Sequence, residues 1–301
     1  MFRTRQLVWI ILRALILACI VSGVAVSAPG IEQTAHLQPT PSGPGVALGY
    51  GGGGKQLDDL GSVWYLDYNF ETSSWQNHQR LYFVQFTSPP QVVARVAHQF
   101  PGQWWTFGNE PNDPNQDNIT PEAYVKPYHD LYFALKQTDP SAHLVPTGVA
   151  NADWRWLDTW REKYRATYGR YPPVDGWRFH NYLLDTCEGA LNVDEFERRA
   201  LVFRDWVNRI GDNVRPIFLT EYGVLYGNGC CGCPLIPQHA LIKYMQATTR
   251  WLRESRVVNA WAWFAVDSEN RFNGDLFAGD QILTTGLAYQ ELVRQWRIAP
   301  K

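Results

Sequence analysis

Short apolar and aromatic runs recur along the chain, and longer amphipathic stretches separate them. Eight of these runs have the length and composition of strands: 46–50, 62–68, 81–86, 103–108, 143–148, 176–180, 216–220 and 257–266. They are near-continuously apolar rather than alternating. That pattern is typical of strands buried on both faces, as in a parallel sheet.

Helical patterns lie between the runs and are strong only from residue 121 onward. We predict helices at 121–137, 152–168, 193–210, 237–254 and 284–296. The connections at 55–60, 71–80 and 90–100 are short or polar. Strands that alternate with helices predict an α/β fold, here a single-domain (β/α)8 TIM barrel with weak or short helices after the first strands.

An open doubly wound sheet is the structural alternative. Four glycines at 51–54 follow the first run, where such a sheet binds dinucleotide phosphates. No strong helix follows these glycines, and no acidic residue ends the next run in the expected context. The pattern therefore disfavours dinucleotide binding.

The N-terminus has the pattern of a targeting segment. Arg3 and Arg5 precede a largely apolar run at 7–26, and small residues at 26–28 offer a cleavage site. We predict a secretory signal peptide cleaved near Pro29. An uncleaved signal anchor is the alternative, because a run of about 20 apolar residues can span a bilayer.

The chain thus divides into a signal peptide or signal anchor at 1–28, a linker rich in Pro, Ser and Gly at 29–44, and a globular barrel at 45–301. We expect a protein that is secreted or associated with the cell envelope, touching a membrane only through the N-terminal segment. A lipid anchor on Cys19 fits less well, because apolar residues continue after it.

The composition fits a folded protein with a heavy aromatic load. Hydrophobic residues make up 45% and charged residues 19%, which excludes a disordered chain. The chain has 14 Trp, whose rings can fill a core or stack on the flat C–H faces of sugars. A net charge of -2 leaves no basic excess to neutralise phosphates, so we expect no nucleic-acid partner. We expect a monomer.

Two glutamates end two of the predicted strands. Glu110 follows the fourth run and Glu221 follows the seventh. In a barrel the C-terminal strand ends converge on the face that holds the active site. Two carboxyl groups facing each other there are the arrangement that cleaves a glycosidic bond: one protonates the leaving oxygen, and the other attacks the anomeric carbon or activates water.

The local sequences around these glutamates resemble a known group. Asn-Glu-Pro at 109–111 and Thr-Glu-Tyr-Gly at 220–223 are similar to the acid/base and nucleophile motifs of glycoside hydrolase clan A, the retaining (β/α)8 glycosidases. Segments that resemble glycoside hydrolase family 128, the endo-β-1,3-glucanases, are 63–70, 107–112, 216–221 and 260–264. The likeness covers most of 45–296.

This resemblance implies a retaining β-glycosidase in which Glu110 is the acid/base and Glu221 the nucleophile. It implies β-1,3-glucan as the substrate and no metal or cofactor. Xylan, xylosides or another β-glycan are the alternative substrates within the clan. We expect the negative charge of Glu221 to raise the pKa of Glu110 and so keep it protonated for the first step.

The resemblance also suggests residues that contact substrate. Asn109 is similar to the clan asparagine that binds the sugar 2-hydroxyl, and His180 and Tyr182 occupy a strand end where the clan often places substrate-contacting residues. Trp263 resembles the aromatic floor beside the scissile bond. Further candidates for the cleft wall are Tyr50, Trp64, Asn69, Gln85 and Trp105.

Four cysteines follow the predicted signal segment. Cys187 lies after the sixth run, and Cys230, Cys231 and Cys233 lie after the seventh, so neighbouring loops carry them. In an exported protein they predict one or two disulfides, with Cys187 bonded to one of the other three. A zinc site that includes a histidine is the alternative, and its candidate histidine is His239.

Two other classes of function fit the same barrel. One is a carbohydrate-binding protein without turnover. The other is a structural or partner-binding protein of the cell envelope. Turnover of a polysaccharide panel separates the enzyme from both.

Overall fold

The eight expected strand regions all form strands in the computed structural model, which describes residues 39–71, 75, 77–226, 233–269 and 271–298. The barrel strands are β1 (Gly43–Gly49), β2 (Trp64–Asp67), β3 (Gln79–Val84), β4 (Trp104–Phe107), β5 (His143–Val145), β6 (Trp177–Asn181), β7 (Ile217–Tyr222) and β8 (Ala260–Asp267). A small hairpin follows, with β9 (Phe277–Ala278) and β10 (Gln281–Ile282).

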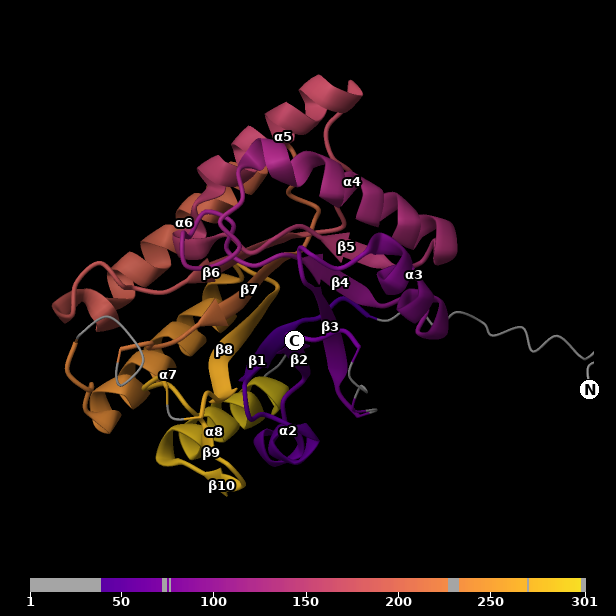
Figure 1. Ribbon diagram of the computed structural model, residues 1–301. Coiled ribbons are helices and arrows are strands. Elements are labelled where there is room, and N and C mark those ends of the chain that lie inside the picture. The colour runs from indigo at the N-terminus through magenta and orange to yellow at the C-terminus, as the bar shows by residue number, and fades with distance from the viewer. Residues whose placement is uncertain (1–38, 72–74, 76, 227–232, 270, 299–301) are drawn as a thin grey trace, which may run out of the picture. The chain divides into compact units, whose positions relative to one another are not determined.

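Helices cover the outside of these strands (Figure 1). They are α2 (Gly54–Leu60), α3 (Pro90–Gln99), α4 (Pro121–Thr138), α5 (Trp154–Tyr168), α6 (Val193–Arg209), α7 (Gln238–Ser255) and α8 (Thr284–Ile298), with the short 3-10 helices η1 (Ala150–Ala152) and η2 (Glu188–Leu191). Side-chain caps fix two helix starts: Thr120 accepts from the Ala123 N–H, and Asn192 accepts from the Glu195 N–H.

The strands form one parallel sheet in the order β5-β4-β3-β2-β1-β8-β7-β6. The two outermost strands approach each other, because Val149 bridges Phe179 in parallel and the Asp175 N–H donates to Leu144 O. The sheet is therefore a nearly closed barrel, which confirms the predicted fold. As expected, the helices after the first strands are short: α2 has 7 residues and α3 has 10.

Side chains alternate between the barrel interior and the layer under the helices. Leu66 and Phe83 lie in the inner cluster, whereas Tyr65 and Tyr82, their neighbours in the chain, belong to the outer one. Because both layers are apolar, the strand sequences show almost no polar alternation. Strand ends above the inner cluster form the face that carries the site.

The predicted signal segment at 1–28 lies outside the described residues, as does most of the predicted linker at 29–44. The first strand begins at Gly43, inside the end of that linker. Among the residues that the structure describes, no helix is long and apolar enough to cross a membrane.

Candidate active site

Glu110 and Glu221 lie together near the C-terminal ends of β4 and β7. A cavity of about 300 Å³ opens there, and both carboxyl groups line it. Only 7% of Glu110 and 6% of Glu221 is exposed, so both carboxyl groups are largely removed from water. Phenols, an amide and apolar rings contribute to the rest of the wall, from Tyr50, Tyr68, Asn109, Tyr182, Phe264 and Phe272.

A one-residue bulge in β7 points Glu221 into this cavity. Between Leu219 and Tyr222, β7 has one residue more than its neighbour β8, and against β6 the unpaired residue is Thr220. Glu221 consequently lines the cavity, whereas Tyr222 packs outward and meets the Thr249 hydroxyl of α7 at 2.9 Å. Bulges commonly re-aim a side chain in this way beside an active site.

Glu110 has a backbone conformation that is rare outside glycine, with φ at 44°. Such a conformation costs about 1–3 kcal/mol and persists only where the surroundings impose it. Its N–H donates to Gly148 O at 2.9 Å, and its carbonyl accepts from the Asp113 N–H at 2.9 Å. The preceding Asn109 N–H donates to Asp117 Oδ2 at 2.6 Å. This network holds the loop after β4, and with it the Glu110 carboxyl, in one position.

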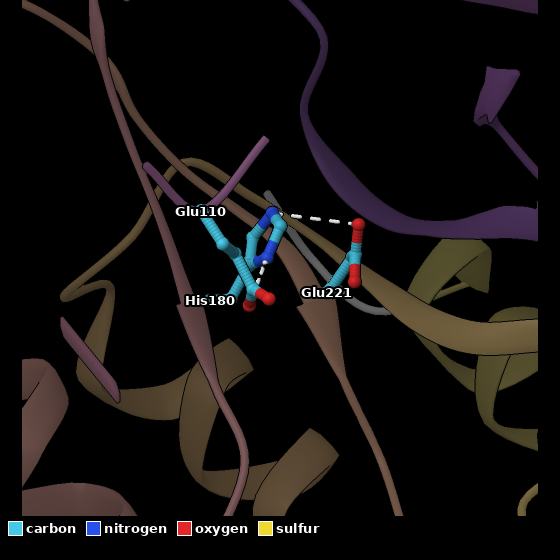
Figure 2. Close-up of side chains that lie close together, drawn as sticks. All are labelled: Glu110, His180 and Glu221. Atoms are coloured by element: carbon cyan, nitrogen blue, oxygen red, sulfur yellow. Dashed lines mark hydrogen bonds and ion pairs between the residues drawn. The ribbon is translucent and has the colours of Figure 1, made fainter. Parts of the chain in front are cut away.

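His180 lies between the two glutamates (Figure 2). Its Nδ1 is 2.7 Å from Glu110 Oε1, and its Nε2 is 3.5 Å from Glu221 Oε1. One oxygen of each glutamate and one ring nitrogen all lie within 4.8 Å of one another. Burial lowers the pKa of His180 to about 3, against the opposing charge of Glu221, so the ring is neutral near pH 7.

Two phenols hold the Glu221 carboxyl. Tyr68 donates to Oε1 at 2.7 Å, and Tyr182 donates to Oε2 at 2.9 Å. Burial, followed by the charge of Glu221, raises the pKa of both phenols well above the ordinary value, so they remain donors. Each oxygen of Glu221 is thus held in place by a phenol that stays neutral and donates a hydrogen bond to it.

Burial raises the pKa of Glu110 to about 8. The charge of Asp113 adds to this effect and that of Asp117 adds less, while Arg178 opposes both. Our expectation of a raised pKa for Glu110 agrees with this value, and the principal causes are desolvation and Asp113 rather than the charge of Glu221 that we named. At neutral pH the group carries a proton, as a general acid requires.

Several predicted contact residues do line the cavity. Asn109, Tyr182 and Tyr50 contribute to its wall, and His180 contacts both glutamates. Tyr50 is 60% exposed, and the Arg271 guanidinium lies over its ring with Cζ 4.1 Å from the ring centroid. This rim of the cavity is therefore formed by Tyr50, which directly follows β1, and by Arg271 from the loop after β8.

Trp64 and Trp263 do not reach the cavity, which corrects two of our predictions. Trp64 begins β2, far from the strand end that carries the site, and its Nε1 donates to Gly43 O at 3.0 Å. Trp263 belongs to the outer layer, is 0% exposed, and donates to Gly274 O at 2.7 Å. Its neighbour Phe264 has the inward orientation and lines the cavity instead.

The remaining candidates also lie elsewhere. Asn69 is exposed, and its Oδ1 accepts from the Glu71 N–H at 2.9 Å in a local turn. Gln85 is exposed just after β3. Trp105 is buried in the outer layer against Tyr82, with ring centroids 4.6 Å apart.

The sequence analysis missed Tyr68, Phe264 and Arg178. Tyr68 continues the inward alternation of Trp64 and Leu66 on β2, and it is the first of these beyond the strand end. That alternation identifies Tyr68 only once the inward orientation of Leu66 is known, and the sequence does not give this orientation. Phe264 follows the inward positions 260 and 262 in the same way.

A larger hollow of about 410 Å³ lies where η1, α5 and α6 begin. Its wall includes Asn151, Trp154, Asp185 and Arg198 but neither Glu110 nor Glu221. Arg155 and Arg209 lie over the Trp154 ring, with Cζ 4.8 and 5.1 Å from its centroid. We therefore place the chemistry in the smaller cavity.

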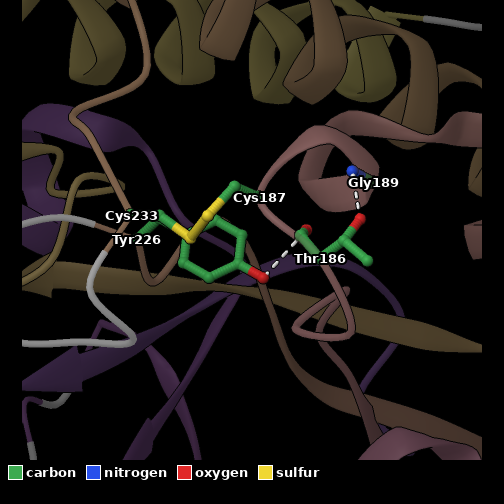
Figure 3. The surroundings of a disulfide bond; sticks show 5 residues. All are labelled: Thr186, Cys187, Gly189, Tyr226 and Cys233. Atoms are coloured by element: carbon green, nitrogen blue, oxygen red, sulfur yellow. Dashed lines mark hydrogen bonds between the residues drawn. A yellow bond between two sulfur atoms is a disulfide. The ribbon is translucent and has the colours of Figure 1, made fainter.

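A disulfide joins the loops after β6 and β7 (Figure 3). Cys187 is bonded to Cys233, which confirms that Cys187 pairs with a cysteine of the second loop. Beside it, the Tyr226 hydroxyl donates to Thr186 O at 3.0 Å. A zinc site that used the thiolates of Cys187 and Cys233 is incompatible with this bond. Cys230 and Cys231 lie outside the described residues.

In the described part of the chain, the one group of three or more potential metal ligands is Glu110, His180 and Glu221. The Arg178 guanidinium lies 3.1 Å from His180 Nε2. A divalent cation bound by this nitrogen would face a fixed positive charge at close range. The donor set therefore fits proton chemistry better than metal binding.

Two buried carboxyl groups that meet across the C-terminal mouth of a parallel barrel are the arrangement found in a glycoside hydrolase. The family model described as "Glycosyl hydrolase catalytic core" matches residues 54–289, and the chain belongs to that family. A search of curated proteins found no match.

Solved structures share the fold at low sequence identity. An endo-β-1,3-glucanase of glycoside hydrolase family 128, subgroup I, from Amycolatopsis mediterranei is 21% identical, with a TM-score of 0.64 over 83% of this chain and 99% of that one. A subgroup II endo-β-1,3-glucanase from Pseudomonas viridiflava is 20% identical, with a TM-score of 0.63 over 83% and 98%. A curdlan-specific exo-β-1,3-glucanase of subgroup III from Blastomyces gilchristii is 18% identical, with a TM-score of 0.61 over 83% and 99%. The resemblance to family 128 seen in the sequence thus extends to the fold.

Proposed function

We propose that this protein hydrolyses β-1,3-glucan with retention of anomeric configuration, with Glu221 as nucleophile and Glu110 as acid/base. The observation that carries the mechanism is the approach of the two carboxyl groups, because one oxygen of each lies within 4.8 Å of the other. Retaining glycosidases have carboxyl groups about 5–5.5 Å apart, whereas inverting enzymes need about 6.5–9.5 Å to admit a water molecule.

In the first step a Glu221 oxygen attacks the anomeric carbon while Glu110 gives its proton to the leaving oxygen. The glycosidic C–O bond breaks, an ester forms on Glu221, and the shortened sugar chain departs with a hydroxyl group. In the second step Glu110, now ionised, takes a proton from water as the water oxygen attacks the same carbon. The ester breaks, Glu221 becomes a carboxylate again, and Glu110 is again protonated.

The substrate proposal rests on the cavity wall and on the solved structures of similar fold. Tyr50, Phe264 and Phe272 offer apolar rings against which a sugar face can pack. The Amycolatopsis enzyme has been solved with laminaritriose, and as glutamate variants with laminarihexaose or with shorter laminari-oligosaccharides. Those ligands are β-1,3-glucan fragments.

We also propose that the protein acts outside the cytoplasm, either secreted or held at the cell envelope. The apolar run at 7–26 after Arg3 and Arg5 supports export. The Cys187–Cys233 disulfide supports an oxidising compartment. N-terminal sequencing of exported protein should find a start near Pro29, whereas a membrane-bound chain that keeps residues 1–28 would favour the anchor.

Hydrolysis of laminarin, curdlan, xylan, mannan and mixed-linkage glucan tests the substrate. We expect laminarin or curdlan to be cleaved fastest, by wild-type enzyme and by the control Glu197→Gln, and not by Glu221→Ala. Faster hydrolysis of xylan or mannan would reassign the substrate and leave the mechanism intact. Binding without turnover would indicate a carbohydrate-binding protein.

Product stereochemistry tests the roles of the two glutamates. Proton NMR of early products should show the β-anomer from a β-linked substrate. With an activated aryl glycoside, azide should rescue Glu110→Ala to give the β-glycosyl azide, and rescue Glu221→Ala to give the α-glycosyl azide. Early release of the α-anomer by wild-type enzyme would rule out Glu221 as the nucleophile.

A further inference from the structure

Arg178 is a buried cation beneath the catalytic pair. It lies on β6 with 0% exposure, and in the described part of the chain no carboxylate lies within ion-pair distance of it. Its guanidinium instead donates to neutral acceptors: Thr220 Oγ1 at 2.8 Å, His180 Nε2 at 3.1 Å, Asn109 Oδ1 at 3.3 Å, Gly108 O at 3.4 Å, and Thr106 Oγ1. Acceptors from β4, β6 and β7 thus converge on one side chain.

The neighbouring strand β5 leaves room for this arrangement. Gly148 follows β5, and a Cβ atom there would lie 2.5 Å from His180 Nε2 and 2.7 Å from Arg178 Nε. Only glycine lets these two side chains meet. A buried guanidinium normally requires a counter-charge, and the charges of Glu221 and Glu110 both act on Arg178.

The contact between Arg178 and His180 decides where the histidine proton lies. A guanidinium has N–H donors and no acceptor, so Nε2 of the neutral ring must accept from it. The ring proton is therefore on Nδ1, which donates to Glu110 Oε1 at 2.7 Å. The acid proton of Glu110 is then left on Oε2. The opposite tautomer would place an N–H of His180 against an N–H of Arg178.

We propose that Arg178 is a positioning residue that locks His180 in the Nδ1–H form and carries the positive charge that balances one carboxylate at every stage of turnover. The charge balance rests on the proposed two-step mechanism. Before the first step the carboxylate is Glu221 and Glu110 is protonated. In the glycosyl-enzyme Glu221 is a neutral ester and Glu110 is ionised. The negative charge moves from one glutamate to the other while Arg178 remains its counterpart.

The other titratable groups around this centre do not supply that balance. Asp113 and Asp117, from the loop after β4, add negative charge. The buried phenols of Tyr68, Tyr124 and Tyr182 have pKa values raised well above the ordinary value, mainly by desolvation, and stay neutral. Arg178 is therefore the group, among those named here, that carries a positive charge to balance the carboxylate.

The tautomer can be measured without any activity assay. Nitrogen-15 NMR of wild-type protein at pH 7 should show His180 neutral, with its proton on Nδ1, the signal being assigned by its loss in His180→Gln. A proton on Nε2 would overturn the proposal. Because this experiment needs no substrate, it separates failure of this inference from failure of the proposed glucanase activity.

Substitution tests the charge. Arg178→Met removes a positive charge that favours both ionised carboxyl groups, so both limbs of the kcat/KM pH profile should move to higher pH, with a loss of the order of 100-fold at the wild-type optimum. Arg178→Lys keeps the charge and should leave the limbs near their wild-type positions while kcat falls. Arg161→Met, a buried arginine of α5, is the matched control and should leave the profile unchanged. If Arg178→Met folds and the limbs of its kcat/KM pH profile do not move, the charge role of Arg178 is overturned. If this variant does not fold, the pH profile of Arg178→Lys and the NMR measurement of the His180 tautomer decide instead.

Discussion

The raised pKa of Glu110 makes a quantitative prediction about alkaline pH. With a pKa of about 8, about nine-tenths of Glu110 is protonated at pH 7, whereas with the ordinary value of 4.5 only about 0.3% would be. The acid form disappears as pH rises through this pKa. We therefore expect kcat/KM on laminarin to fall to half near pH 8 and to about a tenth near pH 9.

Replacing Glu110 should remove this alkaline limb. Glu110→Gln should lose about 10²–10⁴-fold on laminarin and much less on a dinitrophenyl glycoside, whose leaving group needs no proton. Asp113→Asn removes a charge that raises the Glu110 pKa, so its limb should move to lower pH. Glu197→Gln, which replaces a glutamate of α6 whose pKa burial also raises, is the control.

The assay is kcat/KM at each pH, from reducing-sugar release and from dinitrophenol absorbance, with circular dichroism to confirm folding. A wild-type limb that lies near pH 5 would refute the argument from burial. A limb that persists near pH 8 in Glu110→Gln on the dinitrophenyl glycoside would show that another group titrates there.

Tyr68→Phe removes a hydrogen bond to Glu221 and should lower kcat/KM by about 10–100-fold, with little change in melting temperature. Trp263→Ala should lower the free energy of unfolding by about 3–5 kcal/mol and leave KM unchanged, whereas Phe264→Ala should raise KM; urea unfolding and kinetics on laminarin distinguish them. The Cys187–Cys233 bond spans 46 residues, so Cys187→Ser should lower the free energy of unfolding by about 4 kcal/mol. Titration of denatured, unreduced protein that finds both of these thiols free would contradict this bond.

The sequence was sufficient for the barrel because strand length and alternation with helices are local properties. It was also sufficient for Glu110 and Glu221, since parallel strands bring their C-terminal ends to one face wherever they lie in the chain. Both glutamates were identified from their positions at strand ends. The structure adds the separation of their carboxyl groups.

The orientation of single side chains was harder to predict. In a barrel covered by helices both faces of a strand are apolar, so nothing in Ala-Trp-Ala-Trp-Phe at 260–264 tells which residues face inward. Trp263 was chosen, and Phe264 lines the cavity. The influence of Asp113 on Glu110 depends on a loop that folds back after β4, and that fold is not visible in residue spacing.

The extra residue in β7 has a consequence for comparing and redesigning such chains. If β7 paired regularly with both neighbours and kept all its residues, the alternation from inward Phe218 and outward Leu219 would turn position 221 toward α7 and the following tyrosine into the cavity. A designer who regularised this strand would improve its hydrogen bonding and lose the nucleophile. An alignment that scores only apolar alternation would likewise be displaced by one position from this point, so comparisons of related barrels should be anchored on the irregular pairing rather than on hydropathy.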